Sequence, residues 1–127
     1  MKRYSIKGLE KRKEERKAFP EFFQRHIQNI RDSGLCCEEC GVRLLGDVSE
    51  VAHILPKSTF KSISTLDKNV LYLCSWKSPN NCHSIFDEGS NERVKNMSIF
   101  TIVKDRYLEL SLIVTEKLNW KVDDRYS

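Results

Sequence analysis

The sequence has no long uninterrupted run of hydrophobic residues. Its longest apolar stretches, such as Leu112–Val114, are far shorter than the about 20 residues that a bilayer-spanning helix needs. The N-terminus is charged from Lys2 onward and contains no apolar segment typical of a secretory signal. We therefore expect no membrane association and an intracellular, cytoplasmic protein.

Internal repeats and low-complexity linkers are absent as well. A chain of 127 residues, with 39% hydrophobic and 31% charged residues, fits a single soluble domain with a modest core. Within it we distinguish a basic N-terminal arm and amphipathic helix (1–35), a central core (36–90) and a C-terminal helical extension (91–127). A metal site would help to stabilise such a core, because small cores supply little net stability alone.

Positive charge is concentrated near the N-terminus. The net charge of the chain is +4, whereas residues 1–31 contain ten Lys/Arg and four Glu, which gives +6. The remainder therefore carries −2, the difference between +4 and +6. A basic arm on a near-neutral body suggests a polyanionic partner. The charged segment 7–17 is expected to be an exposed helix that orders only on such a partner, or to remain a solvated tail.

The spacing of apolar residues predicts a helix in the N-terminal third. Phe19, Phe22, Phe23 and the residues up to Ile30 recur at three- and four-residue steps, which is typical of an amphipathic helix. Pro20 predicts its first turn, where a missing N–H costs nothing, and Gly34 predicts its end.

The remaining elements are predicted to be shorter and of mixed type. Strands are expected at 48–55 and 69–73, and a short helix follows residues 79–81 and ends near Gly89. A C-terminal helix is predicted from the apolar spacing between Val103 and Leu118. The β-branched run 99–103 would also suit a strand. Together these elements predict the α+β class.

Five cysteines in an intracellular chain favour metal ligation over a disulfide framework. Cys37 and Cys40 have the two-residue spacing of a metal-binding turn, and Cys74 and Cys82 supply a second pair. Four thiolates suit a tetrahedral zinc ion and leave no open position, so the expected zinc is structural. Cys36 is an alternative to Cys37, but it lacks the two-residue spacing to Cys40. The four residues could instead be buried free thiols.

Between and after these cysteines lie residues suited to hydrolysis. His53 could act as a general base, since its ordinary pKa of ~6.5 leaves much of it neutral at pH 7. His83 and Asp87 are four residues apart, so on a helix they share one face and form a partial site for a divalent cation. Singly, each has another explanation: Asn69 could be a turn residue, and Asp87 could flank a helix end.

Taken together, these residues resemble the motifs of the HNH nuclease family over roughly residues 36–88. His53-Ile54-Leu55-Pro56 resembles the first motif, residues 69–74 (NVLYLC) the middle motif and residues 82–87 (CHSIFD) the last. The four cysteines match the zinc-stapled subgroup. The resemblance implies a ββα-metal core, in which a hairpin packs on a helix, flanked here by N- and C-terminal helices.

The resemblance also implies an activity, namely hydrolysis of DNA by a divalent-metal-dependent endonuclease. His53 would activate water, Asn69 would hold His53 and its loop in place, and His83 with Asp87 would bind Mg²⁺ or Mn²⁺. The expected substrate is double-stranded DNA, cut to leave 5′-phosphate and 3′-hydroxyl ends. Lys57, Lys61 and Lys68 are candidates for contacts to the DNA backbone, a sequence-independent kind of contact. Cutting both strands would require a homodimer, for which the sequence identifies no surface.

The sequence departs from the family pattern at one position. Ala52 stands before His53, where the family usually carries a metal ligand. Glu50 could substitute, but strand alternation places it on the face opposite His53. Two other functions therefore remain open. One is a zinc-stapled DNA-binding module that has lost or weakened hydrolysis, and the other is a protein–protein adaptor on a treble-clef-like zinc site.

Overall fold

The computed structural model describes residues 6–126, with side chains from residue 19 onward. This part of the chain forms five α-helices and one two-stranded sheet, which is compatible with the α+β class. In chain order the elements are α1 (Ile6–Ser33), β1 (Val51–His53), β2 (Val70–Tyr72), α2 (Cys82–Glu88), α3 (Asn91–Lys95), α4 (Phe100–Ile113) and α5 (Trp120–Tyr126). Three 3-10 turns accompany them: η1 (Val48–Glu50), η2 (Lys61–Ile63) and η3 (Asp67–Asn69).

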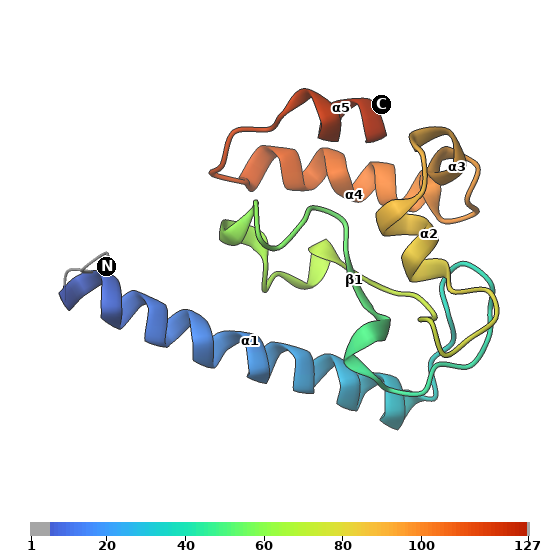
Figure 1. Cartoon of the computed structure of the whole chain (residues 1–127), viewed down its shortest axis with the longest axis horizontal. Helices are drawn as coiled ribbons and strands as arrows, with labels where there is room; N and C mark the ends of the chain where they lie inside the picture. Colours follow the sequence, from blue (N-terminus) through green and yellow to red (C-terminus); the bar gives the residue numbers. More distant parts are fainter. Residues whose placement is uncertain (1–5, 127) are drawn as a thin grey trace.

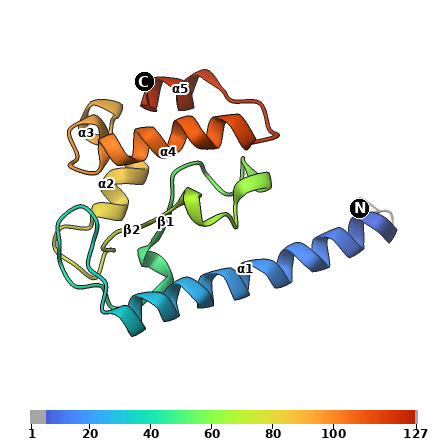
Figure 2. The ribbon, with the colours of Figure 1, turned by 180° about the vertical axis from the view of Figure 1, so that it is seen from behind.

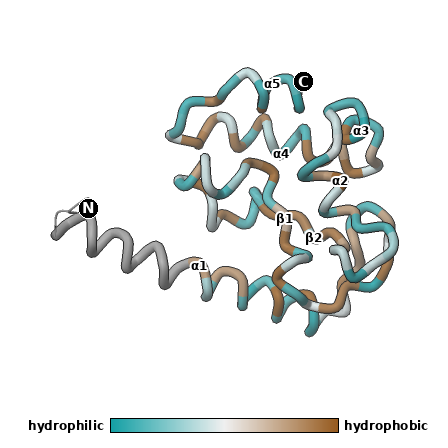
Figure 3. The backbone as a smooth tube through the Cα atoms, viewed as in Figure 1, coloured by the Kyte–Doolittle hydropathy of each residue, from teal (hydrophilic) through white to brown (hydrophobic). Residues whose placement is uncertain are grey.

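The hairpin lies between two groups of helices. Figures 1 and 2 show α1 along one side of the hairpin and α4 with α5 on the other, while α2 and α3 lie at one end of α4. The core is one cluster of buried side chains that draws on α1, the hairpin and α2 to α5. In Figure 3 the two strands are among the most hydrophobic parts of the chain, in line with their central position. None of the described helices has an apolar stretch long enough to cross a bilayer.

Helix α1 is longer than predicted. It runs through Pro20, so the predicted start at this residue is wrong, and it includes residues 7–17. The rings of Phe19 and Phe23, on either side of Pro20 in the sequence, stack with their centroids 6.2 Å apart. The predicted end is confirmed: Gly34 adopts φ +58° directly after Ser33.

The two strands are shorter than predicted. Asp47 and Glu50 form a capping box that winds residues 48–50 into η1, so β1 begins only at Val51. The antiparallel register pairs His53 with Val70 and Ala52 with Leu71. Asn69 lies in η3, one residue before β2.

The C-terminal part contains more helices than predicted. The short helix before Gly89 is confirmed as α2, with Gly89 as its C-terminal cap. Residues 100–103 belong to α4 rather than to a strand, and α4 ends at Ile113, before the predicted end. Its residues Val103, Tyr107 and Leu110 are buried at the predicted helical spacing. Helices α3 and α5 were not predicted, because each is too short to show a periodic pattern.

Candidate functional site

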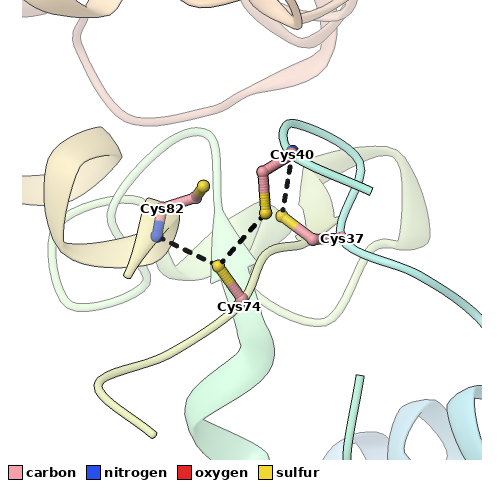
Figure 4. A group of neighbouring side chains, drawn as sticks. All are labelled: Cys37, Cys40, Cys74 and Cys82. Carbon is pink, nitrogen blue, oxygen red and sulfur yellow. Dashed lines mark hydrogen bonds between the residues drawn. The ribbon is translucent and has the colours of Figure 1, made fainter. Parts of the chain in front are cut away.

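Four cysteine side chains come together at one end of the hairpin. Cys37 and Cys40 lie in a turn after α1, Cys74 follows β2, and Cys82 begins α2. Their four Sγ atoms lie within 4.8 Å of one another, and Figure 4 shows them facing a common centre. Cys36 is exposed and lies outside this group, so the structure selects Cys37 as the partner of Cys40. We call these four residues the cysteine cage.

The spacing and surroundings of the cysteine cage suit a tetrahedral metal ion. Zinc–sulfur bonds of about 2.3 Å at tetrahedral angles place two sulfurs about 3.8 Å apart, and Cys40 Sγ lies 3.7 Å from Cys74 Sγ. Backbone N–H groups of Cys40 and Cys82 point at the sulfurs of Cys37 and Cys74, at 3.5 and 3.3 Å. Burial raises the pKa of the Cys37 and Cys82 thiols, so a cation would be needed to keep them ionised. The four cysteines could therefore hold a metal ion.

His53 is fixed at the end of β1. Its ring lies beside the rings of Phe22 and Phe23 of α1, with centroids 5.8 and 6.2 Å away. Its Nε2–H donates to the carbonyl of Ser64 at 2.9 Å, which leaves Nδ1 as an acceptor. Burial lowers the pKa of His53 by more than the Ser64 carbonyl raises it, so the ring is neutral near pH 7. A neutral, oriented imidazole is the form that can accept a proton.

Asn69 organises the loop that follows His53. It is fully buried; its Oδ1 accepts from the N–H of Leu55 at 2.7 Å, and its Nδ2 donates to the carbonyls of Leu55 and Ile63 at 3.0 and 3.4 Å. Its own carbonyl accepts from the N–H of Ile54 at 2.9 Å. Asn69 thus holds the backbone on either side of the loop from residue 54 to residue 64, whose last carbonyl orients His53.

His83 and Asp87 form a pair on one face of α2. His83 Nε2 lies 2.9 Å from Asp87 Oδ2, and His83 Nδ1 donates to the carbonyl of Ser49. Burial lowers the pKa of His83, but the hydrogen bonds to Asp87 and Ser49 outweigh this effect and raise it. A proton therefore lies between His83 Nε2 and the Asp87 carboxylate. A divalent cation could replace this proton and bind both groups.

His53, His83 and Asp87 line the same cavity, which has a volume of about 760 Å³. They come from β1 and α2, and the cavity is closed on another side by α5 and the residues before it. The structure thus brings the candidate base, His53, and the candidate ligand pair, His83 and Asp87, to one cavity. Asn69 lies behind the cavity rather than in its lining.

The position before His53 offers no ligand. Ala52 is completely buried within the hairpin, opposite Leu71. Glu50 does not replace it, because its buried carboxylate accepts the backbone N–H groups of Leu45, Gly46 and Asp47 at 2.7–2.9 Å. Glu50 is therefore occupied in shaping the turn before β1.

The three lysines proposed for DNA contacts have different surroundings. Lys57 lines the cavity, with its ammonium 4.8 Å from the centre of the Phe23 ring. Lys61 is exposed in η2, and Lys68 pairs with Glu109 of α4 at 3.1 Å. Only Lys57 of the three is part of the cavity lining.

Sequence reasoning missed several residues of the cavity. These come from the C-terminal extension and are Asn91, Asn119, Trp120, Lys121, Arg125 and Tyr126. The sequence held one sign of a nucleic-acid contact here, namely Trp120 and Lys121 followed by Arg125. No motif, however, linked these residues to His53. Helix α5 is placed against the site by tertiary contacts, which a single sequence does not reveal.

Comparison with known proteins found no matching family model, no matching curated protein and no matching solved structure. The resemblance to HNH nucleases therefore rests on the order of the residues in this chain.

Proposed function

We propose that the chain is an HNH-type endonuclease that hydrolyses DNA phosphodiester bonds. One observation carries this proposal: His53 faces the same cavity as the His83–Asp87 pair, with its Nδ1 free to accept a proton. The resemblance predicted that a base and a ligand pair belong to one site, and their shared cavity supports that expectation. A protein that only binds DNA would not need a general base in the same cavity as a pair of metal ligands.

We further propose that the cysteine cage holds zinc and that the His83–Asp87 pair holds Mg²⁺ or Mn²⁺. Two ligands at right angles on an ion with bonds of about 2.1 Å lie about 3 Å apart, and the two atoms of this pair are 2.9 Å apart. A hard cation bound there would supply charge stabilisation for a phosphate oxygen and the leaving 3′-oxygen. Waters and phosphate oxygens would fill the remaining positions, since magnesium usually retains several waters.

The residues of this chain have separate roles in the proposed hydrolysis. His53 Nδ1 takes a proton from the water that attacks phosphorus, and the Ser64 carbonyl stabilises the imidazolium through Nε2–H. Asn69 is a positioning residue, because it fixes the loop that carries that carbonyl. Lys57 adds a positive charge at the cavity for the incoming phosphate. The bond between phosphorus and the 3′-oxygen breaks and the leaving oxygen takes a proton from solvent, so the products carry 5′-phosphate and 3′-hydroxyl ends.

A plasmid-cleavage assay tests the proposal. Supercoiled DNA is incubated with the protein and Mg²⁺ or Mn²⁺, beside His53→Ala and the control Glu92→Gln, which changes an exposed residue of α3. We expect nicking or linearisation by the wild type and the control, and about 100-fold or more slower cleavage by His53→Ala, as general-base loss predicts. Equal cleavage by His53→Ala would sink the general-base assignment.

Ala52 favours a second candidate, a zinc-stapled DNA-binding module on the same scaffold. The ligand position before His53 holds only a buried methyl group, and Asp87 is the one carboxylate among the described residues that line the cavity. A gel-shift assay beside the cleavage assay separates the candidates. Retained DNA binding without cleavage at any divalent-metal concentration would establish the module and overturn the nuclease.

A further inference from the structure

We propose that Trp120 forms a subsite that stacks an unpaired base of the nucleic acid, so that the cavity takes single-stranded or locally unpaired DNA. This inference rests on the proposed function and names its substrate class. It is argued from three features: the exposure of Trp120, the attachment of α5 and the charge of the cavity.

Trp120 is a large apolar side chain left open to solvent beside the candidate site. Its exposed fraction is 73%, and it lines the same cavity as His53, His83 and Asp87. The ammonium of Lys121 lies 5.8 Å from the centre of its ring. An exposed indole beside a cation is the combination on which successive bases stack in proteins that bind single strands.

Helix α5 is held firmly enough to present this ring at a fixed place. The Tyr126 hydroxyl donates to the carbonyl of Ile54, the residue directly after His53. The Tyr107 hydroxyl of α4 bonds to Asp123, and the guanidinium of Arg125 lies 5.4 Å from the ring centre of Phe86 on α2. The stacking surface is therefore tied to both elements that carry the candidate catalytic groups.

The charge of the cavity fits a nucleic acid backbone. Among the described residues that line it are three cations, Lys57, Lys121 and Arg125, and one carboxylate, Asp87, which gives a net of +2 (three minus one) before the histidines are counted. Cations can hold phosphates on either side of the scissile bond, while the indole contacts a base. Bases inside a duplex are stacked on their neighbours, so the indole can stack only on a base that is already unpaired or is drawn out.

Trp76 provides a matched control within the chain. It is 71% exposed and has the Lys77 ammonium 5.4 Å from its ring centre, so its local chemistry resembles that of Trp120. It does not line the cavity, and Lys77 forms an ion pair with Asp47. These are the two tryptophans of the chain. Replacing either one with Phe leaves the other as the only indole reporter.

Fluorescence titration without divalent metal tests the subsite separately from cleavage. Trp76→Phe, which retains Trp120, is titrated with a single-stranded oligothymidine and with a hairpin duplex of equal length. We expect the single strand to quench the fluorescence and to bind several-fold more tightly than the duplex. Trp120→Phe, which retains Trp76, should show little quenching while it keeps an aromatic face for binding.

Affinity measurements complete the test. Trp120→Ala should weaken single-strand binding by about 5- to 150-fold, whereas Trp76→Ala should leave it unchanged; circular dichroism verifies that both are folded. Unchanged single-strand affinity in Trp120→Ala, equal quenching by the duplex, or no binding of either DNA by the wild type would each overturn the subsite. Failure of cleavage with intact quenching would overturn the nuclease but leave the subsite standing.

Discussion

His53 shows how one hydrogen bond assigns a chemical role. The Ser64 carbonyl accepts a hydrogen bond from Nε2–H, so the unprotonated nitrogen is Nδ1, and burial beside two phenylalanine rings keeps the imidazole neutral. Without that carbonyl, either ring nitrogen of His53 could be the one that accepts a proton. The role of the residue thus depends on the loop that Asn69 holds, rather than on the histidine alone.

The lowered pKa of His53 predicts the pH dependence of cleavage. A general base acts in its neutral form, so the rate should fall as pH decreases through the pKa of His53, which lies below its ordinary ~6.5. We therefore expect the midpoint of the acidic limb of the rate profile to lie below pH 6.5. The measurement is the single-turnover cleavage rate against pH at saturating Mn²⁺, because protons compete with the metal for His83. An acidic limb centred clearly above pH 6.5 would contradict the burial argument.

At the scale of elements, α1 is attached to β2 and η3 through a polar network around the buried ring of His26. His26 Nδ1 accepts from the Tyr72 hydroxyl, and His26 Nε2 donates to Asp67, which also binds Arg25. The Tyr72 hydroxyl in turn accepts from Asn29 at 3.2 Å. Both nitrogens of the neutral ring are therefore satisfied, and an added proton on Nδ1 would displace the Tyr72 donor.

This network predicts that acid weakens the attachment of α1. Burial lowers the pKa of His26, and Arg25 lowers it further, while Asp67 opposes them only in part. The unfolded chain therefore binds a proton at His26 more readily than the folded chain does. The free energy of unfolding should consequently decrease as the pH falls below about 6.5. Urea unfolding at about pH 7.5 and about pH 5 should show a smaller pH effect for His26→Gln than for the wild type. The same pH effect in both proteins would show that His26 does not contribute.

The sequence predicted those elements whose pattern is local. The spacing of Phe22, Ile30 and their neighbours indicated α1, and Gly34 marked its end, because helix periodicity and a left-handed cap are properties of adjacent residues. Pro20 suits the first turn of a helix, but here it lies inside α1, and its sequence neighbours do not reveal this. The first strand is shorter than predicted because the capping box at Asp47 and Glu50 ends in a 3-10 turn before Val51.

At the scale of the whole molecule, the cysteine cage connects three parts of the chain. It joins the turn after α1 to the end of β2 and to the first residue of α2. The binding free energy of structural zinc, about 10–16 kcal/mol in small zinc domains, matches or exceeds the about 5–15 kcal/mol that stabilises a typical domain. If zinc occupies the cage, the fold should therefore depend on it.

Replacing one cysteine of the cage tests whether the fold depends on bound zinc. Cys74→Ala should lose bound zinc and unfold cooperatively at much lower temperature than the wild type, because Cys74 is buried at the centre of the group. Cys36→Ser, which changes the exposed cysteine outside the cage, should keep about one zinc per chain and wild-type stability. Metal analysis and thermal circular dichroism provide both readings. A folded, zinc-loaded Cys74→Ala protein would contradict the proposal.

The candidate site was predictable from the sequence only in part. His53, His83 and Asp87 could be grouped because their order resembles one family's motifs, and the structure brings them to one cavity. Trp120 and Arg125 could not be grouped with them, since contacts over such sequence separations depend on how α5 packs. Residues that are close in sequence can be grouped from their order, whereas the residues that α5 adds to the cavity depend on tertiary packing.

Cys82 and His83 are consecutive residues at the start of α2. One peptide bond thus connects the four thiols of the cysteine cage to the imidazole–carboxylate pair of the candidate site. Oxidants attack thiolates but leave imidazole and carboxylate groups largely untouched. Oxidation of the cage would nevertheless affect the candidate site if it displaced the start of α2. If both metals bind as proposed, the redox state of four sulfurs governs an activity whose own chemistry involves no electron transfer.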